Sequence, residues 1–130
     1  MTNRKTWARD ALISLLLAAG YMLIFAYNNT PLGAAIGSDN AMYLTMGTAL
    51  AKGYAPYTEI FDHKGPLLFL LQLLPQAVSG GYSLTAVFIQ ETLVLFACLM
   101  MMRAIAKELD VCPWAAQLVY MAMTCAFMDG

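Results

Sequence analysis

A run of seventeen residues without a charge, from Ala11 to Tyr27, constrains the fold of this chain more than any other feature. A helix rises about 1.5 Å per residue, so this run would be about 26 Å long, close to the roughly 30 Å hydrocarbon core of a bilayer. Of the 130 residues, 61% are hydrophobic and 12% are charged, whereas soluble domains carry about 25% charged residues. The sequence therefore predicts an all-α integral membrane protein.

Two further apolar segments, 83–102 and 114–128, bring the expected number of transmembrane helices to about three. Residues 1–10 contain three basic residues, and basic residues gather on the cytoplasmic side of membranes. We therefore expect residues 1–10 and 103–113 to lie in the cytoplasm. Residues 28–82 would then form a loop on the outer face of the plasma membrane.

The two ends of the chain raise separate questions. A basic start followed by an apolar core is also typical of a cleaved signal peptide, but the length of the first apolar run and the spans after it favour a retained helix. The last apolar segment runs into Asp129 and Gly130. We expect the chain to be the amino-terminal part of a longer protein, to pack against residues beyond Gly130, and to be inactive alone.

Two short helices are expected inside the outer loop. Ser38 suits a helix N-cap and Gly53 suits a terminator, so the first helix should run to about Lys52. The second, 66–78, begins with Pro66, a residue favoured in the first turn of a helix. Its thirteen residues span only about 20 Å, too little to cross the bilayer. We therefore expect both helices to be juxtamembrane.

The outer loop collects acids, a cation, a histidine and aromatic residues directly before an apolar helix. The candidate site residues are Asp39, Tyr43, Tyr57, Asp62, His63 and Lys64. A ligand with a charged head and a lipid tail fits such a place. Lys64 precedes a helix start, where free N–H groups and the helix dipole favour a phosphate. Asp39 is the candidate general base for an attacking hydroxyl group.

Each of these residues also has an interpretation without chemistry. Acids in a first turn commonly complement the helix dipole, as Asp39 would after Ser38. Lys64 would be an interfacial lysine and His63 an interfacial hydrogen-bonding residue. Tyr54 and Tyr57 would belong to the aromatic belt. Glu91 lies in mid-span, where acids pair within a helix bundle or line a cavity. The three cysteines have no metal-ligand spacing and are expected to be packing residues: Cys98, Cys112 and Cys125.

Together, these residues resemble the opening of the membrane glycosyltransferases of the GT-C superfamily. The branch in question is the one shared by the protein O-mannosyltransferases and the lipid A aminoarabinose transferase. The matching pattern is an acid, a tyrosine, Gly-x-x-Pro-Tyr and Phe-Asp-His-Lys-Gly-Pro, here Asp39, Tyr43, Gly53–Tyr57 and Phe61–Pro66. It extends over about residues 10–75.

The resemblance implies an inverting transfer of a sugar from a polyprenyl-phosphate donor to an acceptor on the outer face. Asp39 would deprotonate the acceptor and Lys64 would lie near the donor phosphate. Asp62, His63, Tyr43 and Tyr57 would contribute to donor binding. Many relatives carry Asp-Glu where this chain has Asp39-Asn40, so the resemblance implies no certain cofactor and leaves a divalent metal open.

Other classes of protein account less well for the outer loop. In a transporter or flippase of a lipid-linked or small polar substrate, Glu91 would be the coupling acid. Such proteins place their polar groups near the midplane of the bilayer, whereas the ionisable residues here gather in the loop. A scaffold would not need them. The net charge of −1 is spread without a basic patch, which argues against a nucleic-acid partner.

Overall fold

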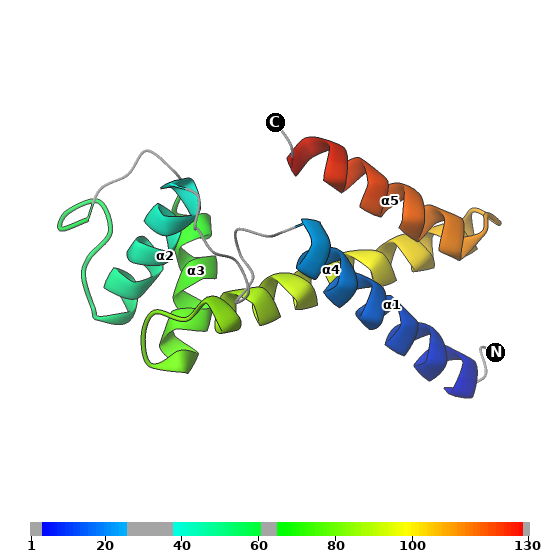
Figure 1. Ribbon diagram of the computed structural model, residues 1–130, viewed down its shortest axis with the longest axis horizontal. Helices are drawn as coiled ribbons and strands as arrows, with labels where there is room; N and C mark the ends of the chain where they lie inside the picture. The colour runs from blue at the N-terminus through cyan, green and yellow to red at the C-terminus, as the bar shows by residue number, and fades with distance from the viewer. Residues whose placement is uncertain (1–3, 26–37, 61–64, 129–130) are drawn as a thin grey trace. The chain divides into compact units, whose positions relative to one another are not determined.

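The computed structural model of this chain describes residues 4–25, 38–60 and 65–128. This part of the chain forms five helices (Figure 1): α1 (Arg4–Phe25), α2 (Ser38–Ala51), α3 (Pro66–Ser79), α4 (Leu84–Glu108) and α5 (Pro113–Met128). The prediction of an all-α fold is confirmed for the described residues. The two helices expected inside the loop 28–82 are present as α2 and α3, within one residue of the expected bounds at each end.

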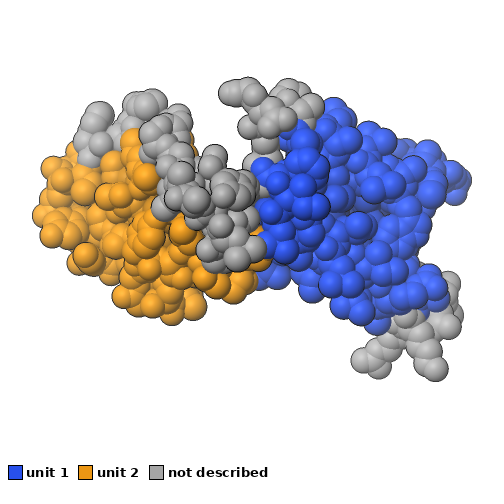
Figure 2. Space-filling view, in the orientation of Figure 1, with its two compact units in different colours: residues 1–26, 91–130 blue, residues 27–90 orange. Residues whose placement is uncertain are grey.

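The chain divides into two compact units (Figure 2). Unit 1 consists of residues 1–26 and 91–130, and therefore contains α1, most of α4 and α5. Unit 2 consists of residues 27–90 and contains α2, α3 and the start of α4.

Two of the described helices are long and apolar enough to cross a bilayer, Thr6–Phe25 within α1 and the 25 residues of α4. Only 28% of the most apolar stretch of α1, and 22% of that of α4, is buried inside the protein. A helix that is apolar all round needs either a protein core or lipid around it. The exposed apolar side chains include Leu12, Leu16, Ile24, Leu93, Val94 and Met101.

The third expected span corresponds to α5, which has 16 residues. Such a helix is about 24 Å long, shorter than the roughly 20 residues that a span usually needs. The described residues therefore provide two helices of spanning length instead of about three.

Both long helices extend beyond the segments expected from hydropathy. α1 begins at Arg4 instead of Ala11, and α4 continues to Glu108 instead of ending at Met102. Residues 103–108 contain no glycine or proline, so nothing in them stops the helix. The expected cytoplasmic loop 103–113 is therefore mostly helical, because helix formation follows backbone propensity and not only hydropathy.

The helix α4 ends at a left-handed turn. Asp110 has φ = 54°, and the N–H of Val111 donates to the carbonyl oxygen of Ala106 at 2.9 Å, a common way to end a helix.

Cys112, in the turn after α4, is exposed, so its prediction as a packing residue is wrong. The backbone N–H groups of Ala115 and Trp114, at the start of α5, lower the pKa of its thiol below the usual value.

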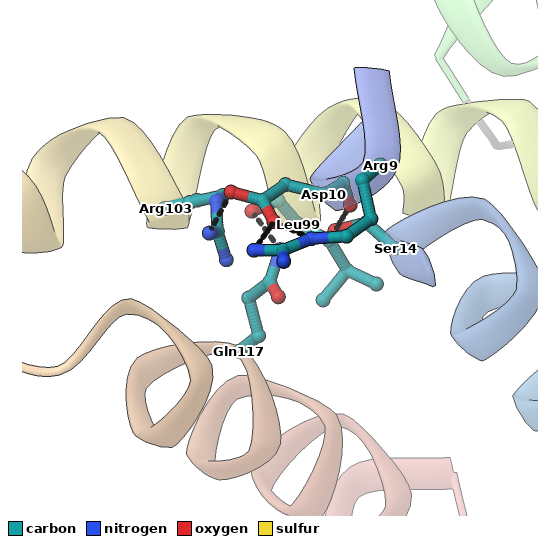
Figure 3. A network of polar contacts seen from close by, with 6 residues as sticks. All are labelled: Arg9, Asp10, Ser14, Leu99, Arg103 and Gln117. Atoms are coloured by element: carbon teal, nitrogen blue, oxygen red, sulfur yellow. Dashed lines mark hydrogen bonds and ion pairs between the residues drawn. The ribbon is translucent and has the colours of Figure 1, made fainter. Parts of the chain in front are cut away.

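A buried ion pair joins the beginning of α1 to the end of α4 within unit 1 (Figure 3). Nη2 of Arg103 lies 2.5 Å from Oδ2 of Asp10, and these residues are 6% and 7% exposed. Arg9 approaches the same carboxylate at 3.2 Å, while the Arg103 guanidinium lies over the Trp114 ring, 4.2 Å from its centroid. Arg103 was expected in an aqueous loop; it is instead buried, because Asp10 and Trp114 offset the cost of removing its charge from water.

A second polar group connects all three helices of unit 1. The side-chain amide of Gln117 on α5 donates to Oγ of Ser14 on α1 and to the carbonyl oxygen of Leu99 on α4, both at 2.9 Å (Figure 3). Ser14 in turn donates to the carbonyl oxygen of Asp10 at 2.9 Å. Since Gln117 and Ser14 are fully buried, these hydrogen bonds fix the register of the three helices.

A Gln117→Leu substitution is expected to lower the free energy of unfolding by about 1–2 kcal/mol, because it removes two interhelical hydrogen bonds. Ser14→Ala removes one of these and should have the smaller effect. Unfolding of the detergent-solubilised chain, followed by circular dichroism, measures both. Equal stability of the Gln117 variant and wild type would contradict this role.

Candidate functional site

Unit 2 is built on the close packing of α2 against α3. Gly47 permits this close packing because it has no side chain. A Cβ atom at this position would lie 2.5 Å from the backbone oxygen of Gln72 and 2.7 Å from its carbonyl carbon. No side-chain rotation could relieve such a contact. The glycine in the middle of α2 therefore allows the backbones of α2 and α3 to lie close together.

The helix α3 has two different faces. Its buried residues are Phe69, Gln72, Pro75 and Gln76, which recur at helical spacing. Its other residues leave a row of exposed apolar side chains, namely Leu67, Leu70, Leu71, Leu74 and Val78. An exposed apolar face of this kind is typical of a surface that meets lipid or a partner. The 14 residues of α3 measure about 21 Å, as expected for a helix that does not cross.

The amino-terminal end of α3 has no capping side chain among the described residues. Gly65 is the N-cap residue, in an extended conformation. Pro66 occupies the first turn, and the N–H of Leu68 donates to the carbonyl oxygen of Gly65 at 3.2 Å. Free N–H groups and the helix dipole at such an end favour an anion.

The chain between α2 and α3 contains a closed turn over residues 55–60. The N–H of Ala55 donates to Oε2 of Glu59 at 2.6 Å, and the N–H of Glu59 donates back to the carbonyl oxygen of Ala55 at 3.1 Å. The N–H of Tyr57 donates to the carbonyl oxygen of Ile60 at 2.6 Å. Glu59 therefore holds this turn together and is a structural acid.

Tyr57 lies at the tip of the turn in a left-handed backbone conformation, with φ = 65°. Non-glycine residues adopt this region at a cost of about 1–2 kcal/mol. Its ring lies 6.0 Å from that of Phe69, tilted by 51°, so the tyrosine joins the turn to α3. A side chain retained at a strained position next to an apolar helix marks a candidate binding residue.

The two effects at Tyr57 can be separated by two substitutions. Tyr57→Ala should destabilise unit 2, because it loses the ring contact and keeps the unfavourable backbone. Tyr57→Gly loses the same contact and removes the strain, so it should be about 1 kcal/mol more stable than the alanine variant. Thermal unfolding of both variants checks the order, and an alanine variant at least as stable as the glycine variant would contradict it.

Two cavities lie along α2, and they share Thr48 and Lys52 in their lining. The larger, of about 220 Å³, is also lined by Thr45, Tyr54 and Tyr82. The smaller, of about 140 Å³, is also lined by Gln76. These residues were missed from the sequence, although Thr45, Thr48 and Lys52 follow at helical spacing and predict one polar face of α2.

Gln76 lies in the last turn of α3 and contacts Ser83, the residue before α4. It is fully buried, and its Oε1 accepts a hydrogen bond from the N–H of Ser83 at 2.9 Å. Its Nε2 has no partner among the described residues. Gly80 and Gly81 follow with φ of 74° and 152°, and the N–H of Gly81 donates to the carbonyl oxygen of Gln76 at 2.9 Å, so the connection between α3 and α4 is a turn tied to Gln76.

The structure describes only some of the site residues expected from the sequence. Asp39 lies in the first turn of α2, but its side chain is outside the described residues, as are Asp62, His63 and Lys64. Tyr43 is half-buried on α2. Within the described ranges, no group of three or more His, Cys, Asp or Glu residues is placed to hold a metal ion.

No family model, no curated protein and no solved structure matches this chain. The resemblance noted in the sequence therefore stays a prediction.

Proposed function

We propose that this chain belongs to a membrane glycosyltransferase that takes a sugar from a polyprenyl-phosphate donor and passes it to an acceptor on the outer face of the plasma membrane. The observation that carries the proposal is the arrangement of unit 2. An acid, Asp39, stands in the first turn of α2. The apolar helix α3, which no described side chain caps, packs against α2 and begins two residues after Lys64 in the chain.

The membrane placement is supported by the charges of unit 1. The ion pair between Asp10 and Arg103 holds the beginning of α1 next to the end of α4. Both ends carry basic residues, so both satisfy the preference of cations for the cytoplasm. With α1 leading out and α4 leading back, the segment between them, including α3, starts and finishes on the outer side.

The proposed reaction is a single displacement. The anomeric carbon–oxygen bond to the lipid phosphate breaks, a bond to the acceptor oxygen forms from the opposite face, and the acceptor proton passes to Asp39. The departing phosphate needs charge stabilisation more than a proton. Lys64 and the free N–H groups of α3 would supply it, and the exposed leucine row of α3 would accommodate the prenyl chain.

The proposal can be tested on the chain itself by photo-crosslinking. A polyprenyl-phosphate sugar with a photoreactive prenyl chain is irradiated with the detergent-solubilised chain, and labelled peptides are mapped by mass spectrometry. We expect labels on α3, competed by unlabelled donor. Labels confined to residues 91–128, around Glu91 and α5, would contradict the donor site and favour a transporter.

A further inference from the structure

A separate cavity of about 200 Å³ lies in unit 1, where the beginning of α1 meets the end of α4. Its lining includes Trp7, Asp10, Arg103, Lys107 and Glu108. This is the end of unit 1 that the placement proposed above assigns to the cytoplasmic side of the membrane. Nothing in the proposed sugar transfer uses it, since that chemistry belongs to unit 2.

The charges around this cavity favour an anion. Nη2 of Arg103 donates a hydrogen bond to Oδ2 of Asp10. Nε and Nη1 of Arg103 are buried without a hydrogen-bond partner among the described residues. Arg9 also pairs with Asp10, so that one acid is already shared by two cations. Lys107 adds a third cation and Glu108 a second acid, which leaves one positive charge in excess over these five residues.

The surroundings of the cavity favour an amphiphile over a free ion. Trp7 is 56% exposed, and tryptophan prefers the boundary between hydrocarbon and headgroups. Within one or two residues of the lining residues, the same two helices expose Leu12, Met101 and Ile105. A charged cavity thus adjoins an apolar surface, and basic pockets between transmembrane helices on the cytoplasmic side commonly hold anionic lipid headgroups.

We propose that this cavity binds the phosphate of an anionic glycerophospholipid, with Arg103 and Lys107 on the phosphate and the acyl chains along the exposed face of α1 and α4. This inference rests on the membrane placement proposed above and not on sugar transfer. Glu108, at the edge of the same cavity, weakens binding of the anion.

Phosphatidylglycerol and phosphatidylcholine are added separately to the chain in neutral detergent, and bound lipid is measured by native mass spectrometry. We expect phosphatidylglycerol to bind more tightly. Lys107→Gln should weaken its binding roughly fivefold, the effect of one basic residue near a lipid surface. Glu108→Gln should strengthen it. Glu59→Gln, which removes an exposed acid of unit 2 that holds the 55–60 turn, is the matched control for Glu108→Gln and should not change lipid binding.

Three results would overturn the proposal. The first is equal binding of the two lipids by wild type, and the second is a Glu59→Gln variant strengthened as much as Glu108→Gln. The third is displacement of the lipid by inorganic phosphate at equal concentration, which would assign the cavity to a free anion. Failure of sugar transfer would leave the lipid site untouched, because Lys107 and Glu108 lie in unit 1 and take no part in the proposed transfer.

Discussion

In the proposed glycosyltransferase, an Asp39→Asn variant is expected to transfer sugar about 10²–10⁴-fold more slowly than wild type, the usual contribution of a positioned general base. The amide keeps the size of the carboxylate but cannot accept the acceptor proton. Loss of a charge in the first turn of α2 costs only about 0.3–1 kcal/mol. Initial rates with saturating donor measure the effect, with unfolding temperature as the measure of folding.

Glu59→Gln is the matched control for Asp39. Glu59 is an acid in the same segment between α1 and α4, but it holds the 55–60 turn by accepting the N–H of Ala55. The amide retains an acceptor oxygen, so this variant should keep most of the wild-type rate. A Glu59 variant slowed as much as the Asp39 variant would show that the loss at Asp39 reflects the loop and not a proton transfer.

A Gly47→Ala substitution is expected to lower the free energy of unfolding of unit 2 by about 1–3 kcal/mol, the typical cost of overpacking. In an isolated helix the same change would be favourable by about 1 kcal/mol. The sign reverses because the new Cβ would lie 2.5 Å from the backbone oxygen of Gln72, so α2 and α3 must separate. Thermal unfolding measures the loss of stability, and the rate of proteolysis of the α2–α3 segment shows whether the loss is local to unit 2.

Gly20→Ala provides the comparison for Gly47. Gly20 also lies inside a helix, but nothing is within 4 Å of the position that its Cβ would take. The alanine there should be neutral or stabilising, up to about 1 kcal/mol. Similar stabilities of the two alanine variants would contradict the close approach of α2 and α3.

The sequence predicted those helices whose ends carry local signals. Ser38 and Gly53 bracket α2, and Pro66 begins α3, because caps and terminators act through neighbouring residues in the chain. The short length of α3 was likewise predicted, since the polar and turn-forming residues on both sides limit it. These features need no knowledge of the tertiary structure.

The contacts between distant residues could not be predicted in this way. Asp10 and Arg103 are 93 residues apart, and hydropathy placed both in water outside the first two spans. Only the packing of α1 against α4 brings their side chains together, and hydropathy does not report such a contact. Gly47 similarly reads as a weak helix residue until Gln72 of α3 is placed beside it.

The central claim is sugar transfer from a lipid-linked donor, and release of the lipid phosphate tests it most directly. The proposed glycosyltransferase is purified and incubated with radiolabelled polyprenyl-phosphate sugars, and the freed lipid phosphate and the anomeric configuration of the product are determined. We expect release with inversion by wild type, and little release by the Asp39→Asn and Lys64→Ala variants. No release from any donor by the folded protein, or an unchanged rate in the Asp39 variant, would contradict the proposal.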